Sequence, residues 1–353
     1  MLIATGKAKA SRTGGQRNQL VELCRFVAAL VILVHHSYLL GARGSCKCGW
    51  VFVEFFFVLT GYFTTRHVVK AASADNSPKE ALCYTRDKIV CMVPFAWTGI
   101  LLGIVATLMG PVPFEHGMRK LLSLPFNFLF LMGSPLASHS VNFDTPLWYL
   151  TMIVLFLPPL IVVMRKAPHA YQYLLCWLVP ILLLSYTMQT EGKLAVWEIT
   201  IPLLIRGLAD LMLGSLVFYL AEYARRVLSE RGMLLVRVLA IGSFAAFCAF
   251  VVLLPYDGTV FSAELVLATV VVALLVLTNE RNYVCARPVY ALALHLGALS
   301  MPIFCLHYPM QRIVQICLPT MGYGGKLVVS LVATIVLSEI LLWGVGMARK
   351  RRA

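Results

Sequence analysis

Two apolar stretches near the start of the chain, LVELCRFVAALVILVHHSYLL (Leu20–Leu40) and WVFVEFFFVLTGYF (Trp50–Phe63), decide the class of protein. Stretches of about 20 apolar residues are typical of helices that cross the hydrocarbon core of a bilayer. These two also carry Arg25, His36 and Glu54. An ionisable side chain at membrane depth costs about 2.5 to 3.5 kcal/mol, and such residues usually serve function. We therefore expect a functional site on this pair of helices.

The rest of the chain continues the same pattern. Of its 353 residues, 60% are hydrophobic and only 13% are charged, which excludes a soluble domain of this size. We predict an all-α polytopic membrane protein with about ten transmembrane helices. The predicted helices cover residues 20–40, 50–66, 89–108, 146–164, 170–188, 199–220, 236–254, 260–278, 297–318 and 326–347. They form one membrane domain, 20–347, between basic tails at 1–19 and 348–353.

Basic residues predict the orientation. If the short apolar piece Leu121–Met132 does not cross, the most basic connections and both termini lie in the cytoplasm, as the positive-inside rule favours. That piece, broken by Pro125, is then a re-entrant or interfacial helix near 121–132. The polar connection Ala71–Asp87 is predicted to be the longest cytoplasmic loop. The expected location is the cell membrane, with lipids as neighbours.

The net charge of +14 has a simple explanation in this topology, because the basic residues lie at helix ends. No basic-aromatic pattern indicates nucleic-acid binding. Ten cysteines are scattered mostly within apolar stretches, and although Cys46 and Cys48 share a loop, no second cluster completes a metal site. We expect neither a nucleic-acid partner nor a metal.

His36 is the sharpest candidate for chemistry. Imidazole is the usual general base near neutral pH, and Glu54 on the neighbouring helix is a candidate to orient it. The alternative is a hydrogen-bonded pair that only stabilises two helices. His35 lies on a different helical face, by about 100°, and is interpreted as structural.

Other charged residues suggest binding roles. Arg25 precedes His36 by eleven residues, about 16 Å on nearly the same helical face, where it is placed either to hold a phosphate-bearing donor or to anchor in lipid headgroups. Arg86 and Lys88 would assist the first role. Arg206 has Asp210 at i+4, so it either neutralises that carboxylate or binds substrate.

Five motifs together resemble the membrane acyltransferase-3 family. Arg25 and His36 reproduce its R-x10-H spacing, and VEFFFVLTGYF is similar to its FF-x-x-S/T-G motif. Three further segments resemble later family motifs: TRDKIVCMVPFAW (85–97), VNFDTPLWYL (141–150) and LSMPIFCLHYPM (299–310). The resemblance covers nearly the whole chain, and the five motifs occur in the family's order.

The resemblance implies transfer of an acyl group, usually acetyl from acetyl-CoA as co-substrate, to a hydroxyl of a sugar, glycolipid or other cell-envelope molecule. His36 would be the essential histidine, supported by Glu54, while Arg25 and Lys88 would bind the CoA end. The residues implied to line the cavity are Trp148, Tyr149, Arg206 and His307. Handover to a separate envelope-assembly protein is compatible with this role.

Two positions depart from the family pattern. Cys91 stands where a second arginine is common, and Thr151, Met152 and Ile153 follow the Trp motif without its frequent glutamate. Two other functions stay open from the residues alone. A transporter or flippase of a glycan or lipid intermediate would use the same buried charges, and a non-catalytic membrane sensor would keep the fold without needing His36.

Overall fold

The computed structural model is a bundle of helices, and it describes residues 17–41, 46, 48–71, 77–110, 114–134, 136, 142–189, 195–196, 199–253, 261–278 and 287–352. The first half of the bundle contains α1 (Gln19–His35), the 3-10 turn η1 (His36–Leu40), α2 (Val51–Lys70), α3 (Ser77–Met109), α4 (Phe114–Leu122), α5 (Leu124–Phe128), η3 (Thr145–Leu147) and α6 (Trp148–Lys166). The second half contains α7 (Pro168–Ala170), the π-helical turn η4 (Tyr171–Leu175), α8 (Cys176–Gln189), β1 (Ala195–Val196), β2 (Ile199–Thr200), α9 (Ile201–Val227), α10 (Glu230–Leu253), α11 (Phe261–Leu277), α12 (Arg287–Cys317) and α13 (Tyr323–Arg352).

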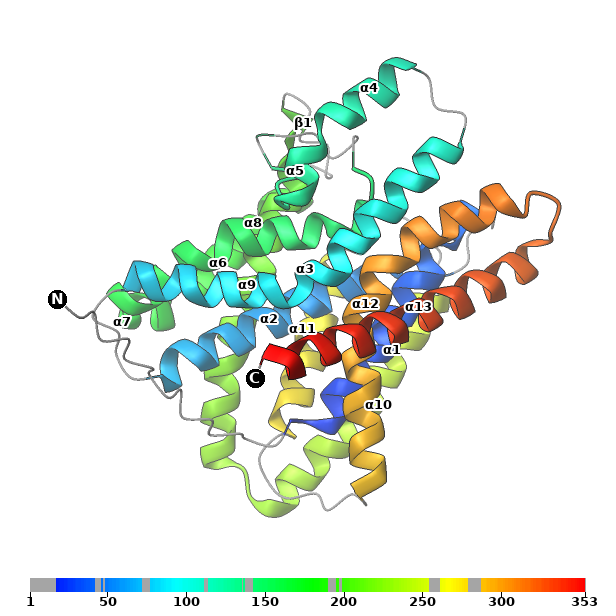
Figure 1. The fold of residues 1–353 in the computed structure, drawn as a ribbon. Helices are drawn as coiled ribbons and strands as arrows, with labels where there is room; N and C mark the ends of the chain where they lie inside the picture. Colours follow the sequence, from blue (N-terminus) through cyan, green and yellow to red (C-terminus); the bar gives the residue numbers. More distant parts are fainter. Residues whose placement is uncertain are drawn as a thin grey trace.

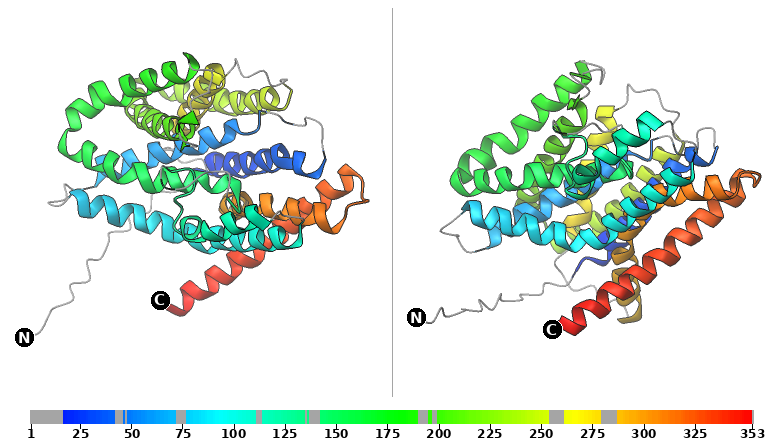
Figure 2. Two further views of the ribbon diagram at one scale, coloured as in Figure 1. Left: turned by 90° about the horizontal axis from the view of Figure 1, so that it is seen from above. Right: turned by 45° about the horizontal axis from the view of Figure 1, so that its top comes forward.

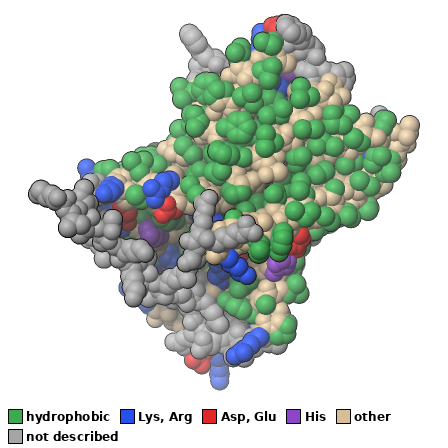
Figure 3. Space-filling model, viewed as in Figure 1, with side chains coloured by type: hydrophobic (Ala, Val, Ile, Leu, Met, Phe, Trp, Pro, Cys, Tyr) green, Lys and Arg blue, Asp and Glu red, His purple; other side chains and the backbone are tan. Residues whose placement is uncertain are grey.

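The predicted helical membrane class is confirmed. Within the described part of the chain, eight helices are long and apolar enough to cross a membrane. They are Gln19–Leu40, Ser77–Met109, Thr145–Lys166, Pro168–Tyr186, Leu203–Val227, Glu230–Leu253, Arg287–Cys317 and Tyr323–Lys350. The count of ten, which also includes α2 and α11, and the cytoplasmic termini stay predictions. On the face seen in Figure 3, hydrophobic side chains cover the region of α3, α12 and α13, and Lys and Arg lie at its margins.

One predicted boundary is wrong. The polar segment expected as a loop up to Asp87 is helical from Ser77, so α3 begins well before its apolar part. Good helix formers such as Lys79, Glu80 and Ala81 explain the extension. The piece near 121–132 forms the end of α4 and the short α5, of nine and five residues, neither of which is long enough to span.

The packing of the helices brings distant segments together (Figures 1 and 2). α1 packs against α12, α2 against α9, and α3 against α6 and α12, while α13 lies at the edge against α12. The α2–α9 contact is close, because a Cβ on Gly61 would meet the backbone of Leu211, and one on Gly214 would meet the backbone of Val58. Small residues allow such backbone approach in membrane helices. Gly61 is the glycine of the FF-x-x-S/T-G motif, so this motif residue serves the crossing.

Candidate functional site

His36 lies where α1 tightens into the 3-10 turn η1, and its partners come from α1 and α12. Its Nδ1 is 3.0 Å from the carbonyl oxygen of Ile32 and 3.1 Å from Nε2 of His307. Nδ1 of His307 is in turn 3.1 Å from the carbonyl oxygen of Ile303. Carbonyl oxygens only accept hydrogen bonds, so Nδ1 carries the proton in both rings. Nε2 of His307 then accepts, and Nε2 of His36 keeps its lone pair.

This arrangement makes His36 a base with a defined tautomer. Its Nδ1–H is shared between the Ile32 carbonyl and His307, which leaves Nε2 as the nitrogen able to take a proton. Within the described residues, Nε2 of His36 makes no hydrogen bond. The rings of the two histidines lie 5.0 Å apart, and that of Tyr308 lies 5.4 Å from His36. The side chain of His307 is completely buried.

Glu54 has a different neighbour from the one expected. It lies fully buried on α2 and pairs with Arg206 on α9, and no hydrogen bond or ion pair joins it to His36 in the described part of the chain. The guanidinium of Arg206 lies 4.8 Å from the ring centroid of Trp50 and 5.6 Å from that of Trp148. The expected support of His36 by Glu54 is therefore corrected: Ile32 and His307 orient the imidazole.

Asp210 lies one turn beyond Arg206 on α9. It is completely buried, and neither of its carboxylate oxygens has a hydrogen-bond partner among the described residues. Arg206 therefore faces two buried carboxylates, of which it contacts Glu54 directly. Arg206 was expected either to neutralise Asp210 on its own helix or to bind substrate. It does contact a carboxylate, but that of Glu54 on α2. Its role in binding substrate stays a prediction.

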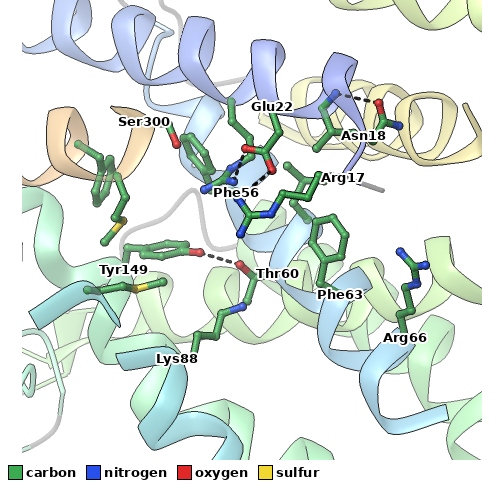
Figure 4. Close-up of a pocket in the computed structure, with 16 residues that line it drawn as sticks. Arg17, Asn18, Glu22, Phe56, Thr60, Phe63, Arg66, Lys88, Tyr149 and Ser300 are labelled. Atoms are coloured by element: carbon green, nitrogen blue, oxygen red, sulfur yellow. Dashed lines mark hydrogen bonds and ion pairs between the residues drawn. The ribbon is translucent and has the colours of Figure 1, made fainter. Parts of the chain in front are cut away.

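A cavity of about 350 Å³ opens between α1, α2, α3, α6 and α12 (Figure 4). One end is basic, and the other is walled by aromatic and hydroxyl side chains. The lining residues are Arg17, Asn18, Val21, Glu22, Arg25, Phe56, Leu59, Thr60, Phe63, Arg66, Lys88, Met92, Tyr149, Ser300, Met301 and Phe304. Of the predicted donor-binding and acceptor-binding residues, it brings together Arg25, Lys88 and Tyr149.

The four cations among the described lining residues, Arg17, Arg25, Arg66 and Lys88, come from α1, α2 and α3 or their ends. Asn18 caps α1 by accepting from the backbone N–H groups of Leu20 and Val21, and it also donates to Leu275 on α11, which fixes the start of α1. One turn later the carboxylate of Glu22 lies 2.9 Å from Nη1 of Arg25 and 4.0 Å from Nη1 of Arg17. Figure 4 shows Glu22 and Arg17 on one wall and Lys88 pointing in from the other, towards Thr60.

Arg86 does not join this group. Its side chain is exposed and bonds to the neighbouring Asp87, at 2.8 and 3.0 Å, whereas Lys88 lines the cavity. Residues two apart on a helix point about 200° apart, so Arg86 and Lys88 cannot share one face of α3. The structure therefore separates two residues that were expected to assist the same donor.

A family model described as an acyltransferase domain matches residues 18–343. The chain belongs to the acyltransferase-3 family. A comparison with curated proteins gave no match, and one with solved structures gave none either. The family match and the apolar helices together indicate a membrane acyltransferase.

The acyltransferase-3 motifs contribute residues that the sequence reasoning did not single out. Thr60, next to Gly61, hydrogen-bonds to Tyr149 at 2.7 Å and joins α2 to α6 in the cavity wall. Ser300 and Phe304 lie on the same motif as His307, seven and three residues before it respectively, so they share its helical face. Their spacing from His307 could have identified them as residues of the site. It was not sufficient, because small polar and aromatic residues on a helix usually serve packing alone.

At the other end of α3, this acyltransferase places Lys120 of α4 in an unusual environment. Lys120 is only 7% exposed, and its Nζ lies 3.4 Å from the carbonyl oxygen of Asn142 and 5.5 Å from the ring centroid of Phe143. Burial, and then the charge of Arg312, lower the pKa of Lys120 to about 8. The charged form is therefore disfavoured in the folded protein.

Replacing Lys120 by methionine should stabilise the protein at pH 7, and less so at pH 10. The unfolded chain holds this proton up to a pKa of about 10.4, whereas the folded chain releases it near pH 8, so the wild type gains stability as pH rises between the two. The variant has no such dependence. Thermal unfolding in detergent at both pH values measures the difference.

Arg119→Met is the matched control, because Arg119 is exposed and pairs with Glu115 one turn away. Its effect on the unfolding temperature should be small at both pH values. A gain for Lys120→Met that is equal at pH 7 and pH 10 would show that the charge of Lys120 is not what destabilises the fold.

Proposed function

We propose that this protein is an integral membrane O-acyltransferase that moves an acyl group, acetyl from acetyl-CoA, to a hydroxyl of a cell-envelope glycan or related molecule. The observation that carries the proposal is the fixed tautomer of His36, whose Nδ1–H is held by Ile32 and His307 and whose Nε2 is left as a base. A base of this kind suits the removal of a hydroxyl proton at neutral pH.

The cavity supplies the donor side of the proposal. CoA carries several phosphates, and Arg17, Arg25, Arg66 and Lys88 gather at the basic end of the cavity. Guanidinium and ammonium groups form strong charge-assisted hydrogen bonds to phosphate oxygens. The apolar walls beyond them, including Leu59 and Phe63, suit the pantetheine arm. The thioester would thus enter the bundle protected from water.

The transfer step then follows from the histidine pair. Nε2 of His36 takes the proton of the acceptor hydroxyl as its oxygen forms a bond to the thioester carbonyl carbon. The carbon–sulfur bond breaks, and the CoA thiolate receives the same proton from Nε2. His36 is neutral before and after the step. Its transient positive charge is stabilised by Nδ1–H donation to the Ile32 carbonyl and to Nε2 of His307.

The acceptor side is proposed to lie beyond the histidine pair, at the end of α1 opposite to the basic cavity. Trp148 and Arg206 would bind there, and Tyr149 lies between the two sides because it lines the donor cavity. The topology proposed from the basic residues puts the donor in the cytoplasm and the acceptor towards the outer leaflet of the cell membrane. No metal takes part in the proposed step.

The test is transfer of label from acetyl-CoA to an envelope fraction in membranes that contain the protein. Lys88→Ala should raise KM for acetyl-CoA by roughly tenfold or more, because a hydrogen bond to a charged group contributes about 1.5 to 3 kcal/mol. Arg86→Ala is the control, since Arg86 lies two residues away and outside the cavity. Its KM should stay at the wild-type value.

Membranes with the wild-type protein could instead consume no acetyl-CoA while an intact glycan or lipid moves across the bilayer. That result would contradict the acyltransferase proposal and favour a transporter. Equal changes in KM for acetyl-CoA in Lys88→Ala and Arg86→Ala would show that the cavity is not the site that binds the donor.

A further inference from the structure

The donor cavity stops short of the catalytic histidine. Its inner end is lined by Phe56 of α2 and Phe304 of α12, and neither His36 nor His307 is among its lining residues. The rings of Phe56 and Phe304 have centroids 6.2 Å apart at an angle of 59°. Phe304 lies 6.2 Å from the ring of His307, which contacts His36. Phe304 therefore links the cavity wall to the histidine pair, and Phe56 lies beside it on the same wall.

Both rings are held in place from several sides. Phe304 is 4% exposed and lies 5.8 Å from the ring of Tyr149 on α6. Phe56 packs against the small apolar cluster of α1 and α12 and lies 5.7 Å from the ring of Phe55. Residues of that cluster are Ala29, Leu33, Leu299 and Ile303. A pair of supported rings leaves little room to widen the passage.

We propose that Phe56 and Phe304 form a constriction that sets the size of the acyl group, so that acetyl passes and longer chains are excluded. The inference rests on the proposed function and names its substrate class, a short-chain acyl-CoA. The acyl group is the tip of the donor, and it has to pass these two rings to bring its carbonyl carbon to His36. One methylene more or less in a tight apolar pocket changes selectivity by roughly 10- to 200-fold.

The experiment compares acetyl-, propionyl-, butyryl- and hexanoyl-CoA as donors in membranes containing the wild type, Phe56→Leu or Phe304→Leu. The readout is the ratio of kcat/KM for each longer donor to that for acetyl-CoA. The wild-type ratio should fall steeply with chain length. Each variant should raise the butyryl ratio by roughly tenfold or more, because leucine removes the ring. Two variants on different helices guard against misfolding of either one.

Phe63→Leu is the matched control. Phe63 lines the same cavity seven residues, or two turns, from Phe56 on the same helix, nearer the basic end. It should change the affinity for all four donors alike and leave their ratio unchanged, because the pantetheine arm passes there rather than the acyl group.

The outcomes separate the two proposals. Acetyl transfer by the wild type with unchanged donor ratios in both variants overturns the constriction and leaves the enzyme intact. A ratio that rises equally in Phe63→Leu also overturns it, since the effect then belongs to the cavity as a whole. Absence of transfer from all four donors by the folded wild type overturns the proposed function, and the constriction with it.

Discussion

His36→Asn should lower acyl transfer by about 100- to 10,000-fold, the usual contribution of a general base. Asparagine is chosen because its Nδ2 occupies the place of the histidine Nδ1 and still donates to the carbonyl oxygen of Ile32. What it removes is Nε2, the nitrogen that would take the proton. The fold should survive, because His36 is only partly buried and the side-chain hydrogen bond to the carbonyl oxygen of Ile32 is retained. Initial rates of label transfer, with protein amount and unfolding temperature measured in parallel, check this prediction.

His35→Asn is the control for the neighbouring position. His35 has the same local chemistry, with Nδ1 3.0 Å from the carbonyl oxygen of Cys46, whereas the hydrogen bond to His307 is made by His36. Transfer by this variant should stay within a few-fold of the wild-type rate. If His36→Asn retains full activity while remaining folded, then the base lies elsewhere and the assignment from the tautomer is wrong.

The relation of Arg25 to His36 was predictable, because it depends only on one helix. Eleven residues are close to three turns, so the helical period placed both on nearly the same face. The structure agrees, with Arg25 in the cavity and His36 at the other end of α1. What the period does not predict is the distance between a helix and its neighbours.

Glu54 illustrates that limit. Its position in α2 marked it as unusual, but nothing on α2 alone says which helix it faces. The structure packs α2 on α9 through Gly61 and Gly214, and this crossing brings Arg206 to Glu54. Isolated glycines in two apolar helices were a signal for a close contact. They did not specify that these two helices were partners.

Arg86 and Lys88 show how a boundary affects a site. With the helix expected to begin after Lys88, both residues were free to point to one donor. Because α3 begins at Ser77, the helical period applies to both and separates them.

Phe56 and Phe304 were not predicted as site residues for another reason. Aromatic residues in apolar helices are ordinarily part of the packing, so their type alone did not indicate a role in the site.

Arg206→Met should destabilise the fold by about 3 to 5 kcal/mol, which is the usual cost of removing one partner from a buried ion pair. Glu54 and Asp210 are both completely buried, and in the variant neither carboxylate keeps the guanidinium that faces it now. Methionine is close to arginine in length, so the lost charge rather than a cavity accounts for the change. Thermal or denaturant unfolding of the purified protein in detergent measures it.

Arg226→Met on the same helix is the control, because Arg226 is exposed in the last turn of α9 and its loss should change stability by less than about 0.5 kcal/mol. The double variant Glu54→Gln with Arg206→Met should recover part of the loss, since it leaves one buried carboxylate instead of two. The coupling of the two single changes then reports their direct interaction. Additive effects would mean that Arg206 stabilises the fold through Trp50 and Trp148 rather than through Glu54. The cation–π contacts with these two rings would then explain why an arginine is tolerated at membrane depth.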